Sequence, residues 1–130
     1  MTDRFEIESL RGEFADAAMQ GEYDRVGALF TADAAWRIPA ANIEFTSRTE
    51  IVEGLQRLRT AWDFLIQTTH PGTIALDGDR ATGRAYVHEI GRFRDGTLHI
   101  NYGVFHDRYE RTGEGWCFAE RTYELLYTPE

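Results

Sequence analysis

The chain has 130 residues, enough for one domain, and 42% of them are hydrophobic, enough for one buried core. Acidic residues outnumber basic ones by 22 to 14, so the net charge of −8 disfavours nucleic acid and anionic membranes as partners. All 14 basic residues are Arg, which excludes Schiff-base and other lysine chemistry.

The single cysteine, Cys117, excludes an internal disulfide and any metal site with several Cys ligands. The first residues, MTDRFEIESL, are charged and lack the apolar stretch of a signal peptide. No apolar run is long enough to cross a membrane. We therefore expect a cytoplasmic protein.

The first half of the chain has helical periodicity. Apolar residues recur at steps of three and four over 5–20, where Gly21 supplies a stop, and again over 24–30. Residues 34–38 are expected to form a short strand, and Pro39 begins a loop. Either Ser47 or Thr49 can cap a third helix that runs to about Gln67. Its expected buried stripe consists of Ile51, Leu55, Leu58, Trp62 and Leu65.

After residue 72 the period changes to two, which is typical of strands. Turn sequences rich in Gly and Asp divide this part into strands near 73–77, 80–93, 97–111 and 115–127. Helices followed by a long antiparallel meander predict a single α+β domain, 1–130, with the helices on one face of a curved sheet.

Alternation places one carboxylate among apolar side chains. In the strand 80–93, Glu89 shares a face with Ala85, Val87 and Phe93, which should point inward. Periodicity alone leaves the inward faces of the next two strands open.

Several segments resemble the SnoaL-like domain of the nuclear transport factor 2 superfamily, over nearly the whole chain. These segments are 21–24 (GEYD), 29–34 (LFTADA), 62–70 with the following Pro-Gly-Thr, 104–111 (VFHDRYER) and 116–121 (WCFAER). The pattern is similar to that of hexachlorocyclohexane dehydrochlorinases and, more distantly, scytalone dehydratases. The resemblance implies a cone-shaped fold of cystatin-like type.

The resemblance also implies site residues. His70 falls on the catalytic histidine of the family and Arg121 on the pocket arginine of the dehydrochlorinases. Met19 takes the place of the aspartate that pairs with this histidine, although another registry of the first helix brings Asp16 there instead. A pocket-facing Arg121 turns Ala119 and Tyr123 inward, and the matching face of the strand before it holds Asn101, Gly103 and Phe105.

The hypothesis that follows is a small-molecule pocket with acid–base chemistry. His70 would be the general base, Glu89 would orient it or act as the acid, and Arg121 with Asn101 would stabilise a developing oxyanion. The substrate-binding residues would be Met19, Trp36, Trp62, Val87, Asn101, Phe105 and Tyr123. Structural alternatives are that His70 caps the third helix and that Glu89 and Arg121 form a buried ion pair.

Two functions fit this pattern. One is a cofactor-independent dehydratase, isomerase or cyclase acting on a small hydrophobic substrate, with polyketide-like molecules as candidates. The other is a non-catalytic ligand-binding or dimeric accessory protein. No metal or nucleotide cofactor is expected, because the His residues lack ligand spacing and the Gly-rich segments are hairpin turns. An outer face with Leu98, Ile100, Tyr102 and Val104 predicts a homodimer through the sheet.

Overall fold

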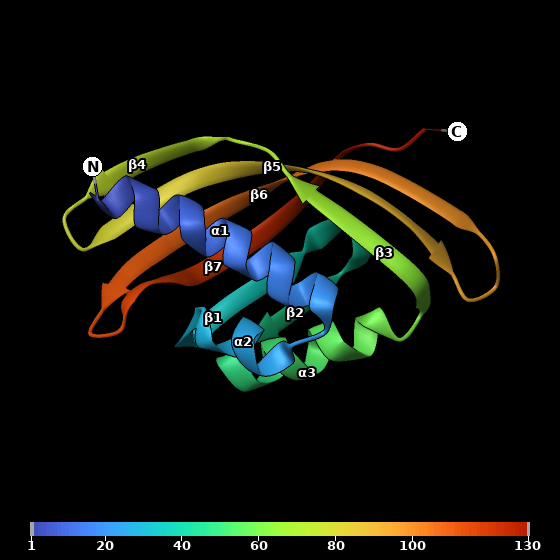
Figure 1. The fold of residues 1–130 in the computed structure, drawn as a ribbon, viewed down its shortest axis with the longest axis horizontal. Helices are drawn as coiled ribbons and strands as arrows, with labels where there is room; N and C mark the ends of the chain where they lie inside the picture. The colour runs from blue at the N-terminus through green and yellow to red at the C-terminus, as the bar shows by residue number, and fades with distance from the viewer. Residues whose placement is uncertain (1, 130) are drawn as a thin grey trace.

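The computed structural model describes residues 2–129, which fold into a strongly curved sheet with helices on its concave side (Figure 1). The helices are α1 (Thr2–Gln20), α2 (Tyr23–Ala28) and α3 (Arg48–Arg59), with a 3₁₀ turn at Pro39–Ala41. The strands are β1 (Phe30–Ile38), β2 (Ile43–Thr46), β3 (Trp62–Thr69), β4 (Thr73–Asp77), β5 (Arg80–Phe93), β6 (Leu98–Thr112) and β7 (Gly115–Tyr127).

The sheet has the order β2-β1-β7-β6-β5-β3. β4 pairs with the same strand as β3, namely β5, but along its first residues. The predicted meander β5-β6-β7 is antiparallel, as expected. β1, however, pairs with β7 in parallel, so the sheet is mixed, not wholly antiparallel, and it does not close into a barrel. Local patterning could not show this pairing, because the two strands lie far apart in the chain.

Helix α1 lies across the concave face of the sheet (Figure 1). Its buried residues Ile7, Leu10, Phe14 and Ala17 follow the predicted helical spacing and join one core with residues of β1, β5, β6 and β7. Gly21 ends the helix with a φ of 72°, a conformation that glycine adopts without steric cost. Helices α2 and α3 pack together beside β1 and β2.

The third helix is shorter than predicted. It begins after Ser47, whose side chain accepts a hydrogen bond from the Glu50 N–H, but it ends at Arg59. Residues 62–69 form β3, so Trp62 and Leu65 belong to a strand and not to a helical stripe. The spacing of the aromatic and branched residues there fits both the helical period and the strand period. Pairing with the edge of β5 stabilises the strand.

Smaller differences concern β1 and β2. Helix α2 ends at Ala28, and β1 starts at Phe30 instead of residue 34. The sequence did not predict β2, because a strand of four residues is too short for its alternation to be recognised; it pairs only with β1. No helix within residues 2–129 has both the length and the apolar character needed to span a bilayer.

Candidate functional site

Glu89 is a half-buried carboxylate on the concave face of β5. Its Oε2 accepts a hydrogen bond of 3.3 Å from Gln67 Nε2 on β3, and its register partner on β6 is Asn101. Its neighbour on the same face, Val87, is 2% exposed. The sequence therefore placed Glu89 on the correct face, and the structure adds Gln67 as its hydrogen-bond partner.

Tyr123 lies on the same interior surface, with its ring against Gly103. A Cβ at residue 103 would lie only 2.3 Å from the Tyr123 hydroxyl, so only glycine leaves room for the ring. The hydroxyl is buried and has no hydrogen-bond partner among residues 2–129. Burial first, and the charge of Glu89 second, raise the pKa of Tyr123, which keeps the phenol protonated at neutral pH.

Trp36 and Phe105 form the aromatic wall next to Tyr123. The Phe105 ring centroid lies 5.2 Å from that of Trp36 and 5.4 Å from that of Tyr123. Trp36 also stacks on Phe14 of α1 at 5.4 Å, and its Nε1 is a second buried polar atom without a partner in the described chain. The predicted wall residues Trp36, Val87 and Phe105 thus lie in one apolar interior.

Arg121 is buried in this core but is held by another carboxylate than predicted. Its Nε and Nη2 donate to Asp107 at 2.8 and 3.2 Å, and the two side chains are 2% and 0% exposed. The guanidinium carbon lies 3.8 Å from the ring centroid of Phe105 and 4.3 Å from that of Phe118. The proposed ion pair with Glu89 is therefore wrong: the partner of Arg121 is Asp107.

Asp107 belongs to a buried polar chain that reaches α1. The Tyr109 hydroxyl donates to Asp107 at 2.7 Å, and Arg11 Nε donates to the same hydroxyl at 2.8 Å. Burial and the charge of Asp107 raise the pKa of Tyr109. Arg11 also donates to the Thr73 carbonyl at 2.8 Å, which ties α1 to β4. The network therefore joins α1 to β4, β6 and β7.

Asn101, Trp62 and His99 gather where β3, β5 and β6 meet. The Asn101 amide contacts His99 Nε2 and its carbonyl oxygen accepts a hydrogen bond of 2.8 Å from Thr128. Trp62 stacks on Phe93 with 4.0 Å between ring centroids, and His99 packs edge-on to the Trp62 ring at 4.9 Å. The amide of Asn101 is thus engaged by protein groups.

His70 lies between β3 and β4, and its side chain is exposed. Its backbone N–H donates to the Tyr86 carbonyl at 2.7 Å, which extends the β3–β5 pairing by one residue. Because α3 ends at Arg59, His70 does not cap that helix. The structure therefore places His70 at the edge of the sheet, with its side chain exposed.

The two helix positions considered for an aspartate partner both lie outward. Met19, in the last turn of α1, is 42% exposed. Asp16 forms an ion pair of 3.0 Å with Arg25 on the outside of the molecule, with its side chain 60% exposed. The alternative registry that would bring Asp16 inward is therefore wrong.

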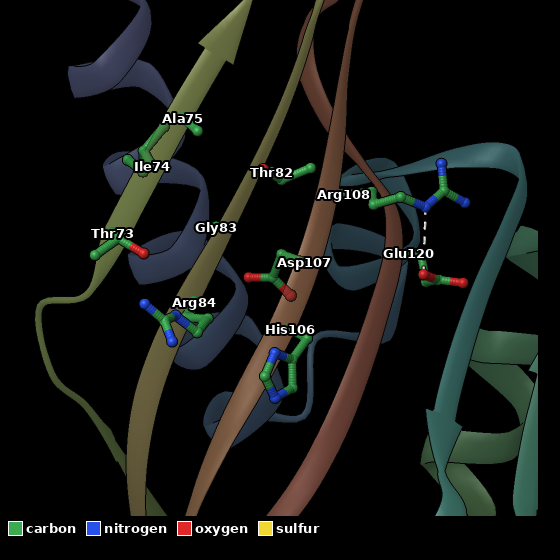
Figure 2. A pocket seen from close by; sticks show the side chains of 10 residues that line it. All are labelled: Thr73, Ile74, Ala75, Thr82, Gly83, Arg84, His106, Asp107, Arg108 and Glu120. Carbon is green, nitrogen blue, oxygen red and sulfur yellow. Dashed lines mark hydrogen bonds and ion pairs between the residues drawn. The ribbon is translucent and has the colours of Figure 1, made fainter.

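A separate groove of about 460 Å³ lies on the outer face of the sheet, across β4, β5, β6 and β7. Figure 2 shows Arg84, His106 and Arg108 on this face, with α1 behind the sheet. Arg108 pairs with Glu120 at 3.3 Å and His106 with Glu124 at 2.9 Å. These pairs satisfy charges on an exposed surface, so we do not place the candidate site in this groove.

Sequence reasoning missed Asp107, Tyr109, Arg11 and Gln67. Alternation along β6 could have identified Asp107 and Tyr109, because they share a face of this strand with Phe105. The pairing of Asp107 with Arg121 depends on a register shift between Arg108 and Tyr109 that no pattern in the sequence reveals.

The chain belongs to the SnoaL-like domain family, whose profile matches residues 1–122. The fold is that of the nuclear transport factor 2-like superfamily, since an NTF2-like protein with a cystatin-like fold from Novosphingobium aromaticivorans superimposes with a TM-score of 0.82. That protein is 23% identical, and the match covers 96% of this chain and 82% of the other.

Two further solved structures share the fold. The hexachlorocyclohexane dehydrochlorinase LinA-type3 from Novosphingobium barchaimii has a TM-score of 0.90 and 15% identity, over 98% of this chain and 89% of its own. A protein proposed to be a scytalone dehydratase, from Novosphingobium aromaticivorans, has a TM-score of 0.85 and 21% identity, over 95% and 83%. No curated protein matches the sequence significantly.

Proposed function

We propose that this protein is a cofactor-independent enzyme that transfers a proton in a small hydrophobic molecule held inside the cone. Its reaction would be of the dehydratase, isomerase or cyclase type. Glu89 is the group that takes or gives the proton. The observation that carries this proposal is the position of Glu89, a half-buried carboxylate that contacts Gln67 and raises the pKa of the enclosed Tyr123.

The chemistry of this surface supports proton transfer. A carboxylate that faces an apolar wall and lies within reach of a bound C–H acid can act as a general base. The Gln67 amide orients the carboxylate, and the protonated Tyr123 hydroxyl can donate to an oxygen on which negative charge develops. Asp107 already neutralises Arg121, so we assign oxyanion stabilisation to Tyr123 in place of Arg121 and Asn101.

His70 remains a candidate for the second proton-transferring group. It is exposed at the junction of β3 and β4. Because the His70 side chain is exposed to water, we assign it the return of the proton to solvent after Glu89 has moved it.

The names of the structural neighbours agree with this class of reaction. A dehydrochlorinase and a protein proposed to be a scytalone dehydratase share the fold, and both names denote eliminations.

Hydrogen–deuterium exchange tests the proposal without requiring the natural substrate. We expect the protein to accelerate exchange at the carbon next to the carbonyl in at least one of a panel of small cyclic ketones, followed by NMR in D₂O. Glu89→Gln should reduce this rate roughly 100-fold or more, the usual size of a general acid–base contribution. His70→Ala should lower the rate at neutral pH and change the pH profile.

The outer face supplies matched controls. Glu124→Gln and His106→Ala replace the same residue types in an exposed ion pair, and both should leave exchange unchanged. Full activity in both Glu89→Gln and His70→Ala would refute the assigned roles.

The second candidate is a ligand-binding protein without catalysis. It is favoured by Met19, an exposed apolar residue at the position where the resemblance places the family aspartate. Absence of exchange with every ketone, together with ligands that raise the melting temperature, would select this function.

A further inference from the structure

The groove of about 460 Å³ on the outer face of the sheet lies on the opposite side from Glu89. In the register of β4, β5 and β6, Ala75 lies opposite Thr82, which in turn lies opposite Arg108. Arg84 follows two residues after Thr82 and shares its face of β5. The short side chains of Ala75 and Thr82 thus form the floor of the groove, and the two long arginines form its sides.

Arg84 is an exposed cation without a protein partner. Within residues 2–129 its guanidinium takes part in no ion pair and no side-chain hydrogen bond. Its register neighbours are Thr73 on β4 and His106 on β6, and His106 is engaged by Glu124 at 2.9 Å (Figure 2). All five N–H donors of Arg84 are therefore available to a ligand.

Arg108 is only partly engaged. Its Nε donates to Glu120 at 3.3 Å, whereas its two terminal nitrogens have no acceptor in the part of the chain that the structure describes. Asp107 also borders the groove, but its carboxylate has no exposed surface and is bound by Arg121. Two guanidiniums and one accessible carboxylate give this groove an excess of positive charge, although the chain as a whole carries −8.

The donors of the groove come from several directions. Arg84 and Arg108 occupy diagonal positions on paired strands, where side-chain origins lie roughly 7–8 Å apart, so one anion can contact both. The exposed hydroxyl of Thr82 lies between them. A carboxylate has two oxygens in one plane, whereas a phosphate group carries three free oxygens and nearly two negative charges at neutral pH. The arrangement therefore favours a phosphate.

We propose that the outer groove binds the phosphate group of a small phosphorylated molecule, with Arg84 and Arg108 as its charged ligands and Thr82 as a hydroxyl donor. A phosphate group alone would fill only a small part of 460 Å³, so the remaining space holds the organic part of the ligand. The net charge of −8 disfavours a nucleic acid as the source of the phosphate.

Two aromatic anions test the inference, phenyl phosphate and benzoate. Isothermal titration of the full chain at constant ionic strength should show that phenyl phosphate binds roughly tenfold more tightly or better than benzoate. Arg84→Gln and Arg108→Gln should each weaken phenyl phosphate binding roughly tenfold or more, the factor expected for a hydrogen bond to a charged group.

Arg80→Gln is the matched control. Arg80 is exposed on the same face of β5, but it lies outside the groove, and its register neighbours Asp77 and Glu110 are acidic. This variant removes the same charge and should keep the parent affinity.

The inference would be overturned by a parent that does not bind phenyl phosphate or that binds benzoate equally well. Unchanged affinity in Arg84→Gln, or an equal loss in Arg80→Gln, would also overturn it, because binding would then not depend on the groove. None of these results bears on the proposed reaction, since Glu89 lies on the other face of the sheet.

Discussion

Replacing Asp107 with Asn tests whether the core depends on a buried charge pair. The carboxylate accepts two hydrogen bonds from Arg121 and one from Tyr109, and its side chain has no exposed surface. Asn has a similar shape but no charge, so the guanidinium of Arg121 would stay buried among aromatic rings without compensation. Arg11, in the same network, adds a second positive charge nearby.

Breaking one side of a buried ion pair typically costs 3–5 kcal/mol, and Asn keeps one acceptor oxygen, so we expect a loss of about 3 kcal/mol. A domain of this kind has roughly 5–15 kcal/mol of stability, so the variant should unfold at much lower urea concentration. Glu124→Gln removes an exposed carboxylate paired with His106 and should cost under about 1 kcal/mol.

Urea unfolding followed by tryptophan fluorescence measures both variants. Substituting both partners, Asp107→Leu with Arg121→Met, should recover part of the loss, because the Arg121 guanidinium is no longer buried without its carboxylate, while Arg11 keeps its hydrogen bonds to Tyr109 and Thr73. If Asp107→Asn costs no more than Glu124→Gln, the account of the core given above is incorrect.

Three further predictions concern other regions. Gly103→Ala should lower the free energy of unfolding by about 1–3 kcal/mol and weaken ligand binding, because its Cβ would displace the Tyr123 ring; an unchanged urea midpoint would contradict this. Hydrogen bonds from Arg111 and Trp116 favour the Asp3 carboxylate and lower its pKa. Asp3→Asn should therefore be less stable than the parent above pH 4, and the two proteins should become equally stable below the lowered pKa of Asp3. Melting temperatures recorded against pH measure this difference, and a difference that does not change with pH would refute the prediction. We also propose a dimer through the exposed apolar outer face, so light scattering should give about twice 14.9 kDa, and Tyr102→Arg should restore the monomer mass.

Strong local patterns predicted β4, β5 and β7 with the bounds that the structure shows. Turns rich in Gly border these strands, and alternation fixed the inward face of β5, although it left that of β7 open. The segment 62–69 was misread as helix because its apolar residues satisfy both periods, and only the edge of β5 selects the strand. The same limit applied to the sheet order, since the parallel contact of β1 with β7 joins residues distant in sequence.

Alternation likewise predicted part of the candidate site. It turned Glu89 inward correctly, but the partner of Arg121 depends on a bulge between Arg108 and Tyr109. The outer face was also only partly readable: Tyr102 is exposed as predicted, whereas Val104 is 3% exposed and buried within the chain itself. Whether an outer-face side chain such as Val104 is covered by its neighbours depends on packing, which periodicity does not encode.

The place of β7 between β1 and β6 has a consequence for how the chain acquires its structure. Both neighbours keep an unpaired edge until residues 115–127 arrive, and those residues emerge from the ribosome after almost everything they bind. Folding of the sheet therefore waits until residues 115–127 have been synthesised, and a truncation before β7 would leave two unpaired strand edges that favour aggregation.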